Sequence, residues 1–173
     1  MTLDEVALKH GTDKSSRMHH YTRFYERFLG KDVKSLLELG VYHGDSIRMW
    51  AEWFPDAKIY GVDINEPLDF SPPVYIYKYD QADPKLLELF PEGIEVVVDD
   101  ASHDLPKTFD SLNLLWPITK KWYCIEDGNW QTFPQAIAQW VSDRFWEIDE
   151  FHLFPNLNYG KPIGVCFAMI LKK

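Results

Sequence analysis

The sequence predicts an α/β protein built on one mostly parallel sheet, and three observations carry this prediction. From residue 33 onward, short runs rich in β-branched residues alternate with amphipathic helical patterns, which is the order of repeated strand–helix units. The run Ile94–Asp99 is largely valine and isoleucine without regular alternation, as in strands buried on both faces of a sheet. Near the end, the turn-rich stretch 155–160 separates two further apolar runs, which indicates a closing antiparallel hairpin.

The elements are expected in a regular order, with right-handed crossovers between the parallel strands. Strands are predicted at residues 33–39, 58–64, 74–79, 94–99, 122–126, 146–154 and 163–171, which makes a seven-stranded sheet. Helices are predicted at residues 45–54, 84–90, 106–116 and 133–145. Before them, aromatic residues three and four apart between Tyr21 and Phe28 indicate a helix that Gly30 ends. We therefore expect a single domain over residues 1–173, in which residues 1–30 form an N-terminal helical cap.

The composition argues against several classes of protein. With 173 residues, 46% of them hydrophobic, the chain has enough apolar surface for one core. Its formal net charge of −9 argues against a nucleic acid partner, because nucleic-acid binders carry a basic face. No apolar run approaches the ~20 residues that span a membrane, and the first residues show no export signal. We expect a cytoplasmic protein in which Cys124 and Cys166 are buried, reduced thiols.

A glycine-containing turn follows the first predicted strand. Gly40 and Gly44 allow the backbone to turn sharply and to approach a ligand closely. Tyr42 stands where the dinucleotide-binding pattern G-x-G-x-x-G has its second glycine, so less room is left for a pyrophosphate. The turn therefore favours a nucleoside-type ligand over a dinucleotide.

Polar side chains end the next two predicted strands. Asp63, followed by Ile64, ends the second strand, where an acid accepts hydrogen bonds from ribose hydroxyls. Asp80 and Gln81 end the third strand, where the edge of an adenine ring would lie. Each feature alone has an ordinary explanation, such as a turn or a helix cap. Their occurrence at the ends of successive strands favours a nucleoside site.

Two pairs of acidic residues follow the fourth and fifth predicted strands. These pairs are Asp99 with Asp100 and Glu126 with Asp127. If the two strands are neighbours, about 4.8 Å apart, the carboxylates converge and need a cation. Carboxylate oxygens suit a hard ion, so Asp100, Glu126 and Asp127 are the predicted ligands of Mg²⁺. The alternative is that these acids cap the helices that follow, which accounts for some of them but not for both pairs.

The histidines and the polar N-terminal residues receive different predictions. His103 lies three positions after Asp100, near the start of a predicted helix, and from there an imidazole can take a proton from a hydroxyl. His103 is therefore the predicted general base. His19 and His20 are expected on the surface, and residues 11–14 are expected outside the core because they are polar.

These motifs resemble a known family of enzymes. Glu38-Leu39-Gly40, with Gly44 and Asp63, resembles the class I S-adenosylmethionine (SAM)-dependent methyltransferases. The longer run 38–46 is similar to that of the small catechol-type O-methyltransferases. Residues 10–14, 20–25, 48–50, 54–55, 99–103 and 125–127 resemble motifs of the metal-dependent, macrocin-type sugar O-methyltransferases and their cephalosporin-hydroxylase-like relatives.

The resemblance implies a Rossmann-like class I methyltransferase fold that binds SAM and Mg²⁺. It also implies methyl transfer to a hydroxyl of a small molecule, such as a sugar of a natural product or a glycan. The SAM-binding residues that it indicates are Glu38, Gly40, Tyr42, Gly44, Ser46, Asp63, Ile64, Asp80, Gln81 and Asp99. It assigns the metal to Asp100, Glu126 and Asp127, and catalysis to His103 together with Asp100.

Two alternatives stay open, namely a catechol-type phenol O-methyltransferase and a SAM-binding module without turnover. A nucleic-acid methyltransferase is disfavoured, because those acting on exocyclic amines carry an Asn/Asp-Pro-Pro-aromatic motif where residues 99–102 stand here. The macrocin-type enzymes that the motifs resemble are usually longer, with extra N-terminal or lid segments over the acceptor. In this chain, residues 10–25 or a neighbouring subunit are expected to cover the site, which leaves room for a homo-oligomer.

Overall fold

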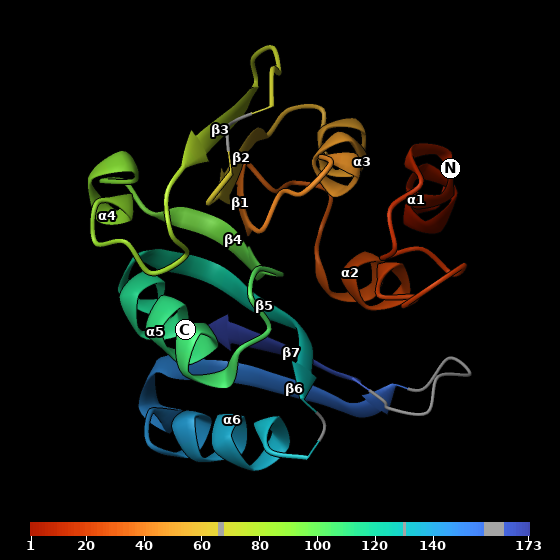
Figure 1. Cartoon of the computed structure of the whole chain (residues 1–173). Coiled ribbons are helices and arrows are strands. Elements are labelled where there is room, and N and C mark those ends of the chain that lie inside the picture. Colours follow the sequence, from red (N-terminus) through yellow and green to blue (C-terminus); the bar gives the residue numbers. More distant parts are fainter. Residues whose placement is uncertain (66–67, 130, 158–164) are drawn as a thin grey trace.

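A computed structural model of the chain describes residues 1–65, 68–129, 131–157 and 165–173. Its strands form one seven-stranded sheet in the order β3-β2-β1-β4-β5-β7-β6 (Figure 1). The strands are β1 (Ser35–Leu39), β2 (Lys58–Asp63), β3 (Val74–Lys78), β4 (Ile94–Asp99), β5 (Thr119–Asn129), β6 (Ile148–Leu157) and β7 (Val165–Lys172). β7 runs antiparallel to both of its neighbours, and the other pairs are parallel. The predicted fold class is therefore confirmed.

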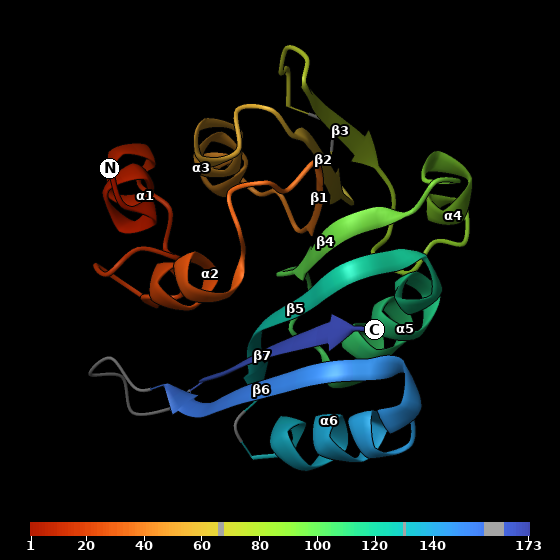
Figure 2. The same ribbon diagram turned by 180° about the vertical axis from the view of Figure 1, so that it is seen from behind.

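Helices cover the two faces of the sheet in separate layers. One layer holds α1 (Leu3–His10), α2 (Thr22–Phe28) and α3 (Asp45–Trp53). The other holds α4 (Leu86–Leu89), α5 (Leu105–Leu115) and α6 (Phe133–Ser142). The view from behind shows the same separation (Figure 2). None of the helices in the described ranges is long and apolar enough to cross a membrane.

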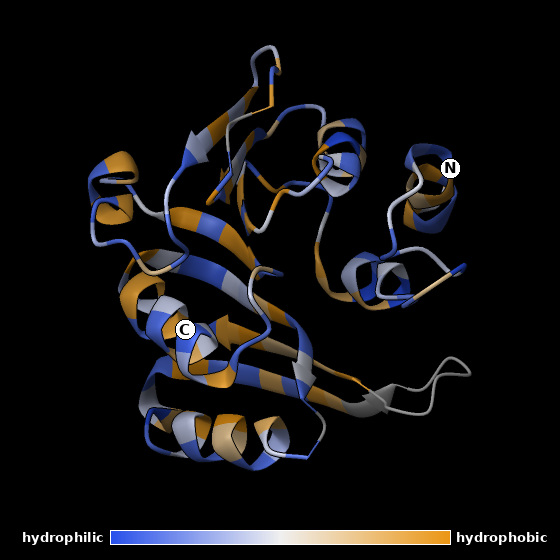
Figure 3. Ribbon diagram, in the orientation of Figure 1, coloured by the Kyte–Doolittle hydropathy of each residue, from blue (hydrophilic) through white to orange (hydrophobic). Residues whose placement is uncertain are grey.

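Alternation along the central strands decides which helix layer each side chain meets. Leu36, Val96 and Cys124 pack into the core beneath α1–α3, whereas their neighbours Leu37, Val97 and Tyr123 pack beneath α4–α6. Figure 3 shows how hydrophobic residues concentrate in the central strands, while each helix carries residues of both kinds. Because side chains on a strand alternate between its faces, Glu38 and Glu126 also project toward the α1–α3 layer.

The fifth strand is longer than predicted, and this difference bears on the acidic residues. β5 ends at Asn129 instead of residue 126. Its pairing with β7 shifts register between Ile125 and Gly128, as at a β-bulge, which redirects side chains. Asp127 lies within this irregularity and has a φ of +51°. Regular alternation therefore stops at the second acidic pair.

The end of the chain differs from prediction in smaller ways. α6 ends at Ser142 instead of residue 145, because Phe145–Glu147 form a separate 3₁₀ turn before β6. The antiparallel pairing of β6 with β7 confirms the predicted hairpin partners. Residues 158–160 and 163–164, which belong to the predicted turn and to the start of the last predicted strand, lie outside the described residues.

The N-terminal residues are more deeply buried than their polarity suggests. α1 begins with a capping box between Thr2 and Glu5, and Gly11 ends it with a φ of +81°. Beyond Gly11, Thr12 and Lys14 are both buried. The prediction that residues 11–14 lie outside the core is therefore wrong for these two. The reason is that Lys14 meets carboxylates from the sheet.

Candidate functional site

A cavity of about 520 Å³ opens at the carboxyl ends of β1, β2, β3 and β4. In this sheet β2 lies on one side of β1 and β4 on the other, and such switch points are where open α/β sheets bind ligands. Its size is in the range of small-molecule and cofactor sites. The lining residues come from the end of β2 and from the segments that follow the four strands, together with residues 11–13 and Lys107.

Most of the predicted cofactor residues line this cavity. Those on its wall are Gly40, Tyr42, Ser46, Asp63, Ile64, Asp80 and Gln81. A Cβ at Gly40, whose φ is +87°, would lie 2.2 Å from the backbone oxygen of Asp100. The glycine is therefore required by the close approach of the β1 and β4 ends, a constraint that exists without any ligand.

Asp63 organises the turn after β1. Its Oδ2 accepts hydrogen bonds from the backbone N–H groups of Val41 (2.9 Å) and Tyr42 (3.0 Å). Its Oδ1 accepts from the backbone and side-chain nitrogens of Asn65. Burial acts to raise the pKa of Asp63, but these hydrogen bonds outweigh it and hold the pKa below its usual value. All four acceptor positions of the carboxylate are used, so a ribose hydroxyl would have to share or replace one of these donors.

Gln81 and Asp80 connect the end of β3 to the α5 segment. The Gln81 side chain donates to the hydroxyl of Ser111 (3.2 Å) and accepts from the backbone N–H of Ser102 (3.2 Å). Asp80 lies 3.6 Å from the ammonium nitrogen of Lys107. Both residues thereby connect the end of β3 to the segment 102–111, at the part of the cavity where the edge of an adenine ring is predicted to lie.

Glu38, Gly44 and Asp99, predicted as cofactor residues, are not among those that line the cavity. Glu38 is fully buried behind the wall, where it accepts a hydrogen bond from Ser46 (2.7 Å). Gly44 has a φ of +77°, and a Cβ there would lie 2.9 Å from side-chain atoms of Leu68 and Phe70. Their direct contact with a cofactor therefore finds no support in the shape of the cavity.

Asp99 lies two positions after Val97 in β4, and alternate residues of a strand share a face. Its side chain therefore points to the α4–α6 face. Its carboxylate accepts hydrogen bonds from the hydroxyls of Ser111 and Tyr123. Burial raises the pKa of Asp99 to about 6. Asp99 thus ties β4 to α5 and β5, on the opposite face of the sheet from Glu38 and Glu126.

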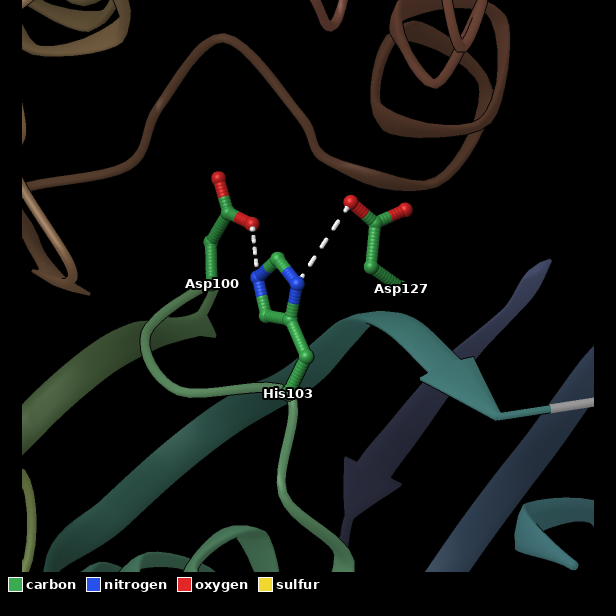
Figure 4. A group of neighbouring side chains, drawn as sticks. All are labelled: Asp100, His103 and Asp127. Atoms are coloured by element: carbon green, nitrogen blue, oxygen red, sulfur yellow. Dashed lines mark hydrogen bonds and ion pairs between the residues drawn. The ribbon is translucent and has the colours of Figure 1, made fainter.

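Asp100 and Asp127 flank the ring of His103 (Figure 4). Nε2 of the ring lies 3.1 Å from Asp100 Oδ1, and Nδ1 lies 3.9 Å from Asp127 Oδ2. One ligand atom from each of the three residues falls within 4.8 Å of the others. The hydrogen bond with Asp100 raises the pKa of His103 above its usual value. The predicted base and two of the predicted metal ligands are thus brought together.

Asp127 also receives two residues from the segment between α1 and α2. His19 Nδ1 lies 3.2 Å from Asp127 Oδ1, and the Tyr21 hydroxyl donates to the same oxygen. Burial acts to raise the pKa of Asp127, but its contacts with His19 outweigh it and bring the pKa to about 2. The side chain of His19 is only 13% exposed, so the prediction that it lies on the surface is wrong. Nothing in its local sequence distinguishes it from a surface histidine.

Glu126, the third predicted metal ligand, does not belong to this cluster. Its carboxylate accepts hydrogen bonds from Lys14 Nζ (2.9 Å) and from the Tyr25 hydroxyl. The cause is the register of β5, which directs Glu126 toward α1–α3 while the bulge redirects Asp127. The four acids therefore do not converge on one point as predicted. Lys14 lies between Asp100 and Glu126, whereas His103 lies between Asp100 and Asp127.

Lys14 lies among three carboxylates. Its ammonium is 2.5 Å from Asp100 Oδ2, 2.9 Å from Glu126 Oε2 and 3.2 Å from Glu38 Oε1. Burial acts to lower the pKa of Lys14, but Asp100, Glu126 and Glu38 outweigh it and hold the pKa well above its usual value. The cation that the acidic pairs demand is thus supplied in part by the chain itself.

Comparison with known proteins places the chain beside sugar O-methyltransferases. It is 32% identical over 151 residues to the 8-demethyl-8-alpha-L-rhamnosyl tetracenomycin-C 2'-O-methyltransferase of Streptomyces olivaceus, covering 76% of this chain and 39% of that protein. It is 29% identical over 142 residues to the mycinamicin VI 2''-O-methyltransferase of Micromonospora griseorubida, covering 72% of this chain and 35% of that protein. The chain spans between 35% and 39% of the length of the curated relatives it matches. No protein-family model matches it.

Solved structures show the same fold. MycE methyltransferase of the mycinamycin biosynthetic pathway, in complex with Mg and SAH, superposes with a TM-score of 0.77 at 21% identity, covering 99% of this chain and 54% of that one. A putative ribosomal RNA methyltransferase from Plasmodium falciparum superposes with a TM-score of 0.68 at 14% identity, covering 92% and 97%. The fold is therefore that of the class I SAM-dependent methyltransferases, as predicted, and it serves acceptors of very different kinds.

Proposed function

We propose that this chain, a relative of the sugar O-methyltransferases of natural-product pathways, transfers a methyl group from SAM to a hydroxyl of a small molecule. A sugar of a natural product is the proposed acceptor, and Mg²⁺ is the proposed metal. The observation that carries the proposal is that Asp100 and His103 belong both to the wall of the nucleoside-sized cavity and to the cluster with Asp127. A methyl donor in the cavity would thus lie beside a proton acceptor.

The donor set at this cluster fits a divalent cation. Asp100 and Asp127 offer carboxylate oxygens, which hard ions prefer, and His103 beside them stays available as a base. A bound cation would lower the pKa of an acceptor hydroxyl and orient it. Glu126 can join these ligands only if its carboxylate leaves Lys14 and Tyr25. We therefore propose Asp100 and Asp127 as the principal ligands.

His103 is the proposed general base. In the reaction a bond forms between the acceptor oxygen and the methyl carbon, the bond from that carbon to sulfur breaks, and the hydroxyl proton must leave. His103 lines the cavity and its side chain is 40% exposed, so a hydroxyl can reach it. Asp100 holds the ring through its hydrogen bond and is thereby proposed to orient the base.

The proposal is tested first by calorimetric titration of SAM and then by a methyl-transfer assay with Mg²⁺. A panel of glycosides and a panel of catechols serve as acceptors. Transfer to glycosides supports the proposal, whereas transfer to catechols alone would identify a phenol O-methyltransferase. SAM binding without transfer to either panel would favour a non-catalytic SAM-binding module. Absence of SAM binding would contradict all three.

A further inference from the structure

Lys14 stands out among the lysines and arginines of the described residues because its side chain is fully buried. It comes from the segment between α1 and α2, and its three carboxylate partners come from the ends of β1, β4 and β5. These three strands are consecutive neighbours in the sheet. The ammonium group of Lys14 therefore links the N-terminal segment to the carboxyl ends of three central strands. The cavity opens at the same edge of the sheet.

The burial of Lys14 excludes direct contact with an acceptor and direct contact with a ligand in the cavity. A side chain with no exposed surface cannot contact an acceptor molecule, and Lys14 is absent from the residues that line the cavity. Its neighbours Thr12 and Asp13 do line the cavity. Lys14 therefore acts on any bound ligand through other residues, by fixing where they lie.

The charges around Lys14 explain why a lysine is needed there. Asp100, Glu126 and Glu38 are three carboxylates from adjacent strands, and buried carboxylates without a counter-charge are strongly disfavoured. Beyond Lys14, hydrogen bonds to them come from the hydroxyls of Ser46 and Tyr25 and from the ring of His103. Hydroxyls carry no charge, so Lys14 supplies the permanent positive charge.

We propose that Lys14 is the internal counter-cation of the site, which keeps the acidic strand ends folded together in the protein free of metal and cofactor. By engaging Glu126 and Oδ2 of Asp100, it leaves Oδ1 of Asp100 and the carboxylate of Asp127 facing His103. It also positions residues 11–13 on the cavity wall. The statement that Lys14 positions Asp100, Asp127 and residues 11–13 for a metal and a cofactor rests on the proposed function. The statement that Lys14 balances the charge of the three carboxylates does not.

The charge part is tested by a double-mutant cycle on the full chain, with EDTA present and SAM absent. Lys14→Met keeps most of the side-chain volume and removes the charge. We expect the melting temperature to fall by about 10 °C, because breaking a buried ion pair leaves uncompensated charge. Lys9→Met, at an exposed ion pair with Glu52, is the matched control and should change the melting temperature little.

The decisive variant adds Glu126→Gln to Lys14→Met. The double variant carries the same formal charge at this cluster as the unaltered protein, since one positive and one negative group are both lost. Glu126→Gln should therefore raise the melting temperature in the Lys14→Met background, although it lowers it when Lys14 is present. A packing role for Lys14 would not reverse that sign.

Three results would overturn the inference. They are an unchanged melting temperature in Lys14→Met, a Glu126→Gln effect of the same sign in both backgrounds, and failure of both Lys14 variants to fold. If Lys14→Met alone fails to fold and the double variant folds, the inference is supported. SAM titration separates this result from the proposed function, because a protein that never binds SAM would refute the function and leave the stability cycle intact.

Discussion

Each carboxylate oxygen of Asp100 contacts a different basic residue. Oδ2 accepts from Lys14 and Oδ1 shares a hydrogen bond with His103. Burial acts to raise the pKa of Asp100, but Lys14 and His103 outweigh it, so the pKa lies below its usual value. An ionised Asp100 thus connects the buried lysine to the proposed base, and the orientation of the His103 ring depends on both.

The pH dependence of turnover should report His103. Its hydrogen bond with Asp100 raises its pKa above the reference value of 6.5, and a general base must be unprotonated. We expect kcat/KM to rise with pH along a limb that reports loss of the His103 proton, and a cation on Asp100 and Asp127 would lower the midpoint of that limb. His103→Ala should lower turnover by about 10²–10⁴ and remove the limb.

The control for this prediction is His10→Ala, since His10 pairs with Glu52 and is not among the residues lining the cavity. It should leave the pH–rate profile unchanged. Full turnover in His103→Ala, or the same limb in its profile, would refute the assignment of the base.

Asp63 should control SAM affinity through the turn that it holds. Asp63→Ala removes the acceptor of the Val41 and Tyr42 N–H groups, both of which belong to cavity-lining residues. A ribose hydroxyl bonded to this carboxylate would contribute about 1.5–3 kcal/mol, so we expect loss of the carboxylate to lower SAM affinity roughly tenfold to a hundredfold. Calorimetry measures this directly, with the exposed Asp56→Ala as the control. Unchanged affinity in Asp63→Ala would contradict the location of the cofactor.

The segment 11–25, which we call the N-terminal strap, is the element that completes the site. Lys14, His19, Tyr21 and Tyr25 all contact acids at the ends of β4 and β5. The bulge in β5 determines which acid each of them meets, because it separates the directions of Glu126 and Asp127. The strap is thus anchored on the sheet by charge, and only its first residues reach the cavity.

Hydrogen exchange tests how the strap responds to SAM. Because residues 14–25 are held by buried acids, we expect their amides to be protected without SAM. Residues 11–13 line the cavity, so their protection should rise when SAM binds. If residues 10–25 exchange rapidly without SAM and become protected together, the strap orders as a unit on cofactor binding and the anchoring by Lys14 is too weak.

The sheet as a whole separates the proposed cofactor and metal regions. Residues on the loops after β1, β2 and β3 line most of the cavity, whereas the cluster of Asp100, His103 and Asp127 comes from the ends of β4 and β5. The acidic net charge of −9 accords with the proposed small-molecule acceptor. The two regions meet only where Asp100 and His103 reach the cavity.

Metal removal should therefore separate chemistry from cofactor binding. We expect EDTA to abolish methyl transfer and to leave SAM affinity largely unchanged, because most of the cavity wall lies outside the cluster. Adding Mg²⁺ back should restore turnover. The measurement pairs a methyl-transfer assay with calorimetry on the same metal-free sample. Full turnover after chelation would show that the acids serve as caps and internal ion pairs instead of as metal ligands.

The sequence by itself determined the order of strands and helices, the cavity-lining turn at Gly40 and the meeting of Asp100, His103 and Asp127. These features are encoded locally, because hydrophobic periodicity reports burial and the ends of parallel strands share one edge. Only the tertiary structure decided which base meets which acid. Lys14 lies 112 residues from Glu126, and a polar segment carries no local sign of the charge it will meet. The partner of a buried charge is set by the packing of distant elements, and here that packing places Glu126, a predicted metal ligand, beside Lys14.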